Sequence, residues 1–309
     1  MKRRILLTGA TAVAALALAA CGANNNPTAP PAGGGGGSTG SAGGGGSITV
    51  GSADFSESQV LGEIYAGAIK AKGVSVTSKP NIGSRDVYIK ALQDGSIDIV
   101  PEYTGSLLTF LKGTAPSQDP DAVYTALKST LPAGLVVLDK STAEDKNSLV
   151  VTKDTQTKYS LKSIADLAAH QADITVAAPP EFQTRQQGLV GLKSEYSFTP
   201  ANFLPLKGAA IVNALKNGQA QAANIFSTDP SIPANGFVTL EDPKLLFGSD
   251  NVVPLLRKDK VNDTITAALN AVSAKIDTAT LTDLVKQVDV DKKDASAVAN
   301  DFLSKNGLG

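Results

Sequence analysis

A pattern that occurs twice in the chain constrains its fold more than any other feature of the sequence. Residues 91–105 predict the end of a helix, an Asp-Gly turn, a short buried strand and an exposed loop that begins at Tyr103. Residues 214–228 repeat this order with an Asn-Gly turn, and Phe226 takes the place of the tyrosine. We therefore expect the chain to build one structural unit twice.

A second pair of similar segments lies upstream of these two. Residues 48–59 and residues 174–186 each predict a strand, a loop that contains a phenylalanine, and the start of a helix. Two such units predict an α/β protein with two lobes of similar plan. Because ligands bind at the carboxyl ends of strands in open α/β sheets, facing lobes would place Tyr103 and Phe226 on opposite walls of one cleft. A chance similarity between short segments is the alternative.

The remaining strands predict how the two lobes are connected. Residues 148–152 would carry the chain into the second lobe, and residues 251–256 would carry it back. The helical segment at the end of the chain would then pack on the first lobe. The predicted division is residues 48–145 and 254–309 for the first lobe, and 146–253 for the second.

The first 20 residues have the features of a lipoprotein signal peptide. A basic Lys-Arg-Arg segment precedes an apolar stretch that is short for a membrane span, and Leu-Ala-Ala-Cys follows, ending at Cys21. We expect cleavage before Cys21 and lipid attachment to its thiol, with an ordinary secretory signal as the alternative. The rest of the segment 21–47 is rich in Gly, Ser and Pro and predicts a flexible linker. The mature protein would thus be anchored at the outer face of the cytoplasmic membrane.

The balance of charged residues excludes one class of partner. The chain has 28 Lys and Arg residues against 29 Asp and Glu residues, and removal of residues 1–20 takes away three of the basic ones. The mature chain is therefore mildly acidic, and its sequence is not that of a nucleic-acid-binding protein. Cys21 is the only cysteine, so no intramolecular disulfide is expected.

The sequence also argues against catalysis. Once Cys21 is lipidated no free thiol remains, and His170, the only histidine, lies in no Ser-His-Asp pattern. Residues 48–309 contain no Gly-x-Ser-x-Gly elbow, phosphate-binding loop or metal-ligand spacing. We therefore expect a protein that binds without turnover, cofactor or metal. A structural or adhesive surface lipoprotein is a remote alternative.

Several segments together resemble a known family. They are Gly51-Ser-Ala-Asp-Phe-Ser-Glu, Gly83-Ser-Arg-Asp-Val-Tyr, Pro101-Glu-Tyr-Thr-Gly, Arg185 after Pro-Glu-Phe, and Leu240-Glu-Asp-Pro. These segments resemble the glycine betaine/choline/carnitine substrate-binding proteins of ABC importers, and the similarity spans roughly residues 48–309. The resemblance implies a type II periplasmic-binding-protein fold, in which two crossing strands act as a hinge and the lobes close on a solute like a flytrap. It also implies a monomer that delivers its solute to a membrane permease and the attached ATPase.

The resemblance further implies which side chains bind the solute. Tyr103 occupies a cage-tyrosine position, Phe226 replaces a second cage tyrosine, and Arg185 matches a carboxylate-binding arginine. Aromatic faces attract a quaternary ammonium, and an arginine binds a carboxylate. The other site residues expected from the matching segments are Ser106, Asp54 and Phe55.

Three positions depart from the pattern of the family. Ala53 stands where a lysine can contact the solute, Asn147 near another cage tyrosine, and Asp250 about where the last cage tyrosine is expected. Only two of four aromatic walls are then predicted, which weakens the attraction for glycine betaine. One expectation is a choline-like cation attracted by Asp250. The other is a neutral polyol-like or phenolic solute that Asn147 and Asp250 hydrogen bond.

The proposed site residues also have structural interpretations. Tyr103 could lie in a surface loop, Arg185 could form a salt bridge that stabilises a lobe, and Asp250 could cap a turn. Tyr88 lies within a predicted helix and fits a core position better than a site. These interpretations stay open at the level of sequence.

Overall fold

The computed structural model describes residues 47–112 and 119–309. The predicted signal peptide, Cys21 and all but the last residue of the predicted linker lie outside the described residues. Within the described ranges, no helix is long and apolar enough to cross a membrane.

A five-stranded mixed sheet forms the framework of the first lobe. Its strands are β1 (Ile48–Gly51), β2 (Val76–Lys79), β3 (Ile99–Tyr103), β4 (Leu135–Val137) and β10 (Val252–Arg257). They lie in the order β2-β1-β3-β10-β4. The first three run parallel, whereas β10 runs antiparallel to both of its neighbours. A strand from the last quarter of the chain therefore completes a sheet that the first half begins.

A second five-stranded sheet forms the framework of the other lobe. Its strands are β5 (Leu149–Val151), β6 (Thr175–Ala178), β7 (Asn202–Pro205), β8 (Ala222–Asn224) and β9 (Val238–Thr239). Their order is β7-β6-β8-β5-β9, with β6 parallel to β7 and β8, and β5 antiparallel to β8 and β9. Each strand thus has a counterpart at the same place in the first sheet. The predicted repeat of one α/β unit is confirmed.

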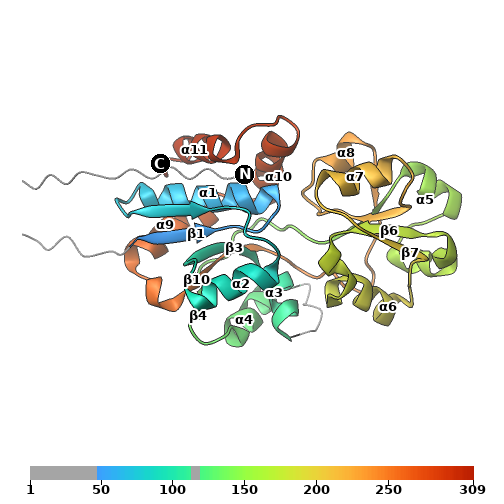
Figure 1. Cartoon of the computed structure of the whole chain (residues 1–309), viewed down its shortest axis with the longest axis horizontal. Coiled ribbons are helices and arrows are strands. Elements are labelled where there is room, and N and C mark those ends of the chain that lie inside the picture. The colour runs from blue at the N-terminus through green and yellow to red at the C-terminus, as the bar shows by residue number, and fades with distance from the viewer. Residues whose placement is uncertain (1–46, 113–118) are drawn as a thin grey trace, which may run out of the picture. The chain divides into compact units, whose positions relative to one another are not determined.

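The end of the chain packs on the first lobe, as predicted. The helices α9 (Asp263–Ser273), α10 (Thr278–Asp289) and α11 (Ala295–Lys305) contact α1 (Ser56–Lys70). Figure 1 shows α11 beside the blue α1. Leu61 and Ile64 are buried in one apolar core with Leu269 and Phe302. The residues at which one lobe passes into the other stay a prediction.

Shorter helices cover the faces of both sheets. The first lobe adds α2 (Arg85–Asp94), α3 (Thr104–Lys112), α4 (Pro120–Thr130) and the 3-10 turn η4 (Lys258–Lys260). The second contains α5 (Lys153–Tyr159), the 3-10 helices η1 (Ile164–Asp173) and η2 (Pro180–Gln183), the π-turn η3 (Gln186–Val190), α6 (Gly191–Tyr196), α7 (Ala209–Lys216) and α8 (Ser231–Ala234). The apolar side chains of each sheet form separate clusters with the helices of the same lobe.

The segment after β3 differs from the predicted exposed loop. Tyr103 is the last residue of β3 and is 5% exposed, and α3 begins at the next residue. The carboxylate of Asp250 accepts hydrogen bonds from the backbone N–H groups of Gly105 and Ser106, at 2.7 and 2.9 Å, and so caps this helix. Because the cap comes from 145 positions further along the chain, local sequence did not reveal the helix.

A kink at Gly188 also changes the predicted helix after Arg185. Gly188 has non-helical backbone angles, and a Cβ atom at this position would lie 2.0 Å from the carbonyl oxygen of Phe182. Only glycine permits so close an approach. The kink divides the segment into η3 and α6, and leaves Arg185 and Gln187 at the margin of a cavity described next.

Candidate functional site

A cavity of about 530 Å³ lies between the two lobes. The segments that follow β1 and β3 line it from the first lobe, and the segments that follow β6 and β8 line it from the second. These are equivalent strands of the repeat, and their carboxyl ends are where open α/β sheets bind ligands. All eight residues predicted from the sequence line this cavity: Asp54, Phe55, Tyr103, Ser106, Asn147, Arg185, Phe226 and Asp250. Their contact with a solute stays a prediction.

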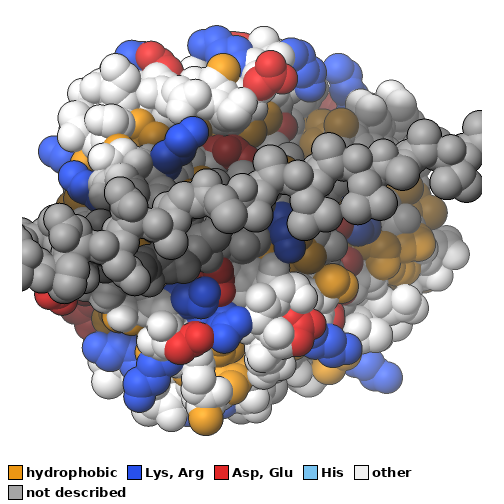
Figure 2. All heavy atoms as spheres, turned by 60° about the vertical axis from the view of Figure 1, so that its left-hand side comes forward, with side chains coloured by type: hydrophobic (Ala, Val, Ile, Leu, Met, Phe, Trp, Pro, Cys, Tyr) orange, Lys and Arg blue, Asp and Glu red, His pale blue; other side chains and the backbone are white. Residues whose placement is uncertain are grey.

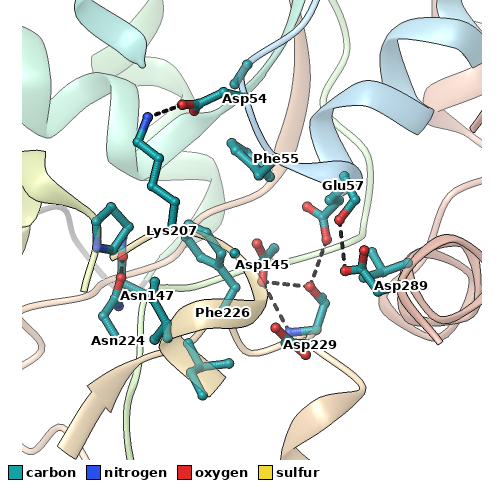
Figure 3. Close-up of a pocket in the computed structure, with 18 of the residues that line it drawn as sticks. Asp54, Phe55, Glu57, Asp145, Asn147, Lys207, Asn224, Phe226, Asp229 and Asp289 are labelled. Carbon is teal, nitrogen blue, oxygen red and sulfur yellow. Dashed lines mark hydrogen bonds and ion pairs between the residues drawn. The ribbon is translucent and has the colours of Figure 1, made fainter. Parts of the chain in front are cut away.

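Three aromatic rings lie in series in the cavity. The Phe55 ring centroid is 6.1 Å from that of Tyr103 and 5.5 Å from that of Phe226, and both pairs are tilted by 32°. Phe55 therefore joins the two rings that the repeat predicted, and it supplies a third aromatic face. Phe55 and Phe226 are partly exposed, whereas Tyr103 belongs to the apolar core. Figure 3 shows Phe55 and Phe226 close together in the cavity.

Two buried carboxyl groups lie beside these rings. The Tyr103 hydroxyl donates to Glu57 Oε1 at 2.6 Å, and the Thr228 hydroxyl oxygen lies 2.7 Å from Glu57 Oε2 and 2.9 Å from Asp145 Oδ1. Glu57 is 4% exposed and Asp145 2%. Burial raises the pKa of Glu57 to about 7, and burial together with the charge of Glu57 raises the pKa of Asp145 well above its usual value.

The sequence did not identify this carboxyl pair as a site. Glu57 belongs to the first segment of the family resemblance, but its spacing from Asp145 carries no signal because the two are far apart in the chain. The contact depends on Thr228, which approaches from the second lobe. The aromatic repeat was the available signal, since Thr228 follows Phe226 by two residues.

Asp250 is held by the N-terminus of α3. Besides the two backbone N–H groups, the Ser106 hydroxyl donates to Asp250 Oδ2 at 2.5 Å. Burial raises the pKa of Asp250 to about 7. The side chain thus caps a helix and also lines the cavity, so both sequence interpretations have structural support. Ser106 also contacts Gln187 Oε1 of the second lobe at 3.0 Å.

Arg185 lines the cavity from the second lobe. Its Nη2 atom is 3.6 Å from Asp86 Oδ2 on the first lobe, and among the described residues Nη2 has no hydrogen-bond partner. Burial and the charge of Arg85 lower the pKa of Arg185. Arg85 itself is paired with Glu102 at 2.7 Å. Arg185 therefore keeps an unused donor, although it takes part in a long ion pair between the lobes.

Two further predicted residues have partners in or across the cavity. Asn147 Oδ1 accepts a hydrogen bond from Asn224 Nδ2 at 3.1 Å. Asp54 forms an ion pair with Lys207 of the second lobe. Figure 3 shows the Lys207 side chain extending toward Asp54, so this pair links the lobes beside the rings.

Acidic side chains outnumber basic ones in the described lining. This makes the cavity more suited to a cation than to an anion. In contrast, Figure 2 shows Lys and Arg interspersed with Asp and Glu on one outer face. No three His, Cys, Asp or Glu side chains of the described chain are grouped to hold a metal ion. The lining acids are Asp54, Glu57, Asp145, Glu181, Asp229, Asp250 and Asp289, and the bases are Arg85, Arg185, Lys207 and Lys292.

Comparisons with known proteins identify the family and support the fold. A family model for the substrate-binding domain of ABC-type glycine betaine transport systems matches residues 46–305. The glycine-betaine-binding protein of Pseudomonas aeruginosa is 27% identical over 276 residues, which cover 85% of this chain and 88% of that protein. The carnitine transport binding protein OpuCC of Listeria monocytogenes is 27% identical over 267 residues, or 84% and 87%. A crystal structure of a glycine betaine/carnitine/choline ABC transporter matches with a TM-score of 0.66 at 26% identity, over 84% of this chain and 99% of that one.

Proposed function

The chain belongs to the family of substrate-binding domains of ABC-type glycine betaine transport systems, and we propose that its interlobe cavity captures a small choline- or betaine-like solute for import. The observation that carries this proposal is the presence of three aromatic rings and an excess of acidic side chains in one cavity. Aromatic faces replace the hydration of a quaternary ammonium, and nearby carboxylates add attraction that an uncharged solute would not receive.

The rings of Phe55, Tyr103 and Phe226 are proposed to hold the cationic group. A desolvated contact of this kind contributes about 2 kcal/mol or more. Phe55 offsets part of the loss of aromatic walls at Asn147 and Asp250. We therefore place glycine betaine among the candidate solutes together with choline, instead of expecting it to bind weakly.

Arg185 is proposed to bind the carboxylate of a zwitterionic solute. Its Nη2 donor has no hydrogen-bond partner among the described residues, and the ion pair with Asp86 is long enough to yield to a closer anion. A solute that has both groups would then lie between the rings and Arg185. Choline, which lacks a carboxylate, would use the rings alone.

The setting of the protein is proposed from its sequence and family. We propose that Cys21 carries the lipid anchor and that the linker lets a monomeric binding domain reach its permease at the outer face of the cytoplasmic membrane. The permease and its ATPase would release and import the solute, so that the protein itself binds without turnover. Cys21 and the linker support this setting through their sequence pattern alone.

Titration calorimetry with a panel of solutes tests the proposal. Choline, glycine betaine and carnitine should include at least one micromolar ligand, whereas sorbitol and phenol should bind much more weakly. The matched variants are Phe55→Ala, which removes the central ring, and Tyr159→Ala, which removes a ring outside the cavity. Phe55→Ala should weaken the tight solute at least about tenfold. Tight binding of only sorbitol or phenol would support the neutral-solute alternative instead.

A further inference from the structure

The contacts around Glu57 need one more proton than the hydroxyl groups supply. Three oxygen–oxygen contacts run in series from Tyr103 to Glu57, from Glu57 to Thr228, and from Thr228 to Asp145, at 2.6, 2.7 and 2.9 Å. Each contact this short needs a hydrogen between the oxygens. The tyrosine and threonine hydroxyls provide two hydrogens, and ionised carboxylates provide none. The third hydrogen must therefore be on a carboxyl group.

The neighbouring donors indicate where that proton lies. Asp145 Oδ1 already accepts from the backbone N–H of Thr228 at 3.2 Å, and the Ser227 hydroxyl lies 3.3 Å from it. This oxygen is therefore an acceptor, and the Thr228 hydroxyl donates to it. Thr228 then accepts from the remaining partner, Glu57 Oε2. The series runs from a protonated Glu57 through Thr228 to an ionised Asp145.

The surroundings supply no cation that would replace the proton. No Lys or Arg of the described residues forms an ion pair or hydrogen bond with Glu57 or Asp145. The titratable groups around the pair are Tyr103 from β3 and Asp229 after β8. Asp289 of α10 lies next to them, because it accepts a hydrogen bond from Ser56, the residue before Glu57. Lys292 acts on Asp289. Like charges buried together favour retention of a proton.

We propose that Glu57 and Asp145 share one proton while the cavity is empty, and that a cationic solute held by the adjacent rings releases this proton to solvent. The pair then selects for cations, because only a positive solute compensates the second negative charge. Solute capture is thereby coupled to pH. The affinity for the solute rises with pH until the pH reaches the value at which the empty pair loses its proton. The solute half of this inference rests on the proposed function, whereas the shared proton does not.

Glu57→Gln is the decisive variant because it replaces the proton with a permanent donor. The amide oxygen can accept from Tyr103, its N–H can donate to Thr228, and the Thr228 hydroxyl can still donate to Asp145. All three contacts are then satisfied with Asp145 ionised. Asp145→Asn removes the second acid from the other side, and it serves as an independent variant if Glu57→Gln folds poorly.

The first experiment follows the side-chain carboxyl carbons of the solute-free protein by NMR from pH 4 to pH 9. Because burial also raises the pKa of Asp250 to about 7, we expect two carboxyl transitions near neutral pH. Glu57→Gln and Asp145→Asn should abolish one of them, whereas Asp250→Asn should abolish only the other. If Glu57 and Asp145 both titrate below pH 5 in the wild type, the shared proton does not exist and the inference is overturned.

The second experiment measures proton release during binding of choline and glycine betaine. Calorimetry in buffers of different ionisation enthalpy should give close to one proton released per solute at pH 6, and close to none for Glu57→Gln. The wild-type affinity should rise by up to about tenfold per pH unit below the transition, because one released proton gives that slope. Binding without proton release overturns the coupling but leaves the proposed function intact. A neutral transition without any binding of these cations supports the shared proton and contradicts the proposed function.

Discussion

Phe55 and Phe226 come from different lobes, yet their ring centroids lie 5.5 Å apart. Each ring is partly exposed and lines the cavity, and the two rings follow β1 of the first sheet and β8 of the second. The ring pair is therefore both a contact between the lobes and a wall of the site. Tyr103 differs from them, because its ring is packed in the core of the first lobe.

Phe226→Ala tests the ring contact without disturbing a core. We expect the affinity for the tightest solute to fall about tenfold or more, because one aromatic face is lost. The melting temperature of the empty protein should change little, since the ring is partly exposed. Calorimetry and thermal unfolding measure the two effects, with Tyr159→Ala as the control. A large drop in melting temperature would show that the ring is structural.

Arg185→Gln separates solutes by their carboxylate. Binding of glycine betaine and carnitine should weaken by about tenfold or more, because a buried charge-assisted contact is lost, whereas choline should be little affected. Asp86→Asn is the matched control, since it breaks the same interlobe ion pair from the other side. The ratio of affinities between the two solute classes is the measured quantity. An equal loss for choline would indicate that Arg185 acts only through lobe closure.

Asp250→Asn distinguishes a cationic from a neutral solute. Asparagine keeps an acceptor for the backbone N–H groups of Gly105 and Ser106, so the cap of α3 should persist. For a cation, the loss of a desolvated charge should cost more than about 2 kcal/mol of binding free energy. For a neutral solute the loss should be small. Affinities of the variant for choline and for the best neutral compound decide between these outcomes.

The empty protein should lose stability as the pH rises toward neutrality. Burial raises the pKa of Glu57 and of Asp250 to about 7, so the folded state holds protons that the unfolded state has already released. The free energy of unfolding therefore falls as the pH rises from the ordinary carboxyl pKa near 4 to about 7. Each of the two groups contributes roughly 1.4 kcal/mol for every unit by which folding raises its pKa. Thermal unfolding from pH 4.5 to pH 8 should show this decline. Glu57→Gln should make the decline shallower.

Cys21→Ser tests the proposed anchor. Without the thiol there is no lipid acceptor, so the protein should appear in the medium or remain unprocessed. Fractionation of cells that express each form, followed by detection of lipid label, measures the effect. Retention of lipid label by the variant would contradict the assignment of the anchor.

The fold was predictable because its signals are local and occur twice. The turn and strand patterns of residues 91–105 and 214–228 lie at β3 and β8, which hold the same place in the two sheets. The rings at Tyr103 and Phe226 follow from this, and the cavity lies where the strand ends meet. Patterns of period two and short turns depend on neighbouring residues, and sequence alone supplies those.

The chemistry of the site was less predictable because it depends on contacts across the chain. Thr228 brings Glu57 and Asp145 into one hydrogen-bonded series. Asp250 caps the N-terminus of α3, which lies far earlier in the sequence. The turn at Gly188 depends on the nearby carbonyl of Phe182. None of these pairs has a characteristic spacing. The raised pKa values follow from burial, which becomes visible only when both lobes are in place.

The duplicated sheet bears on how such proteins diversify. Each wall of the cavity is carried by its own copy of the strand plan, and loop residues such as Asp54, Asn147 and Phe226 lie outside the apolar clusters of the sheets. We expect exchanges in these loops to alter solute preference at little cost to folding, so that one wall can change while the other is retained. The repeat thus lets natural selection vary solute recognition one wall at a time, while the two sheets stay unchanged.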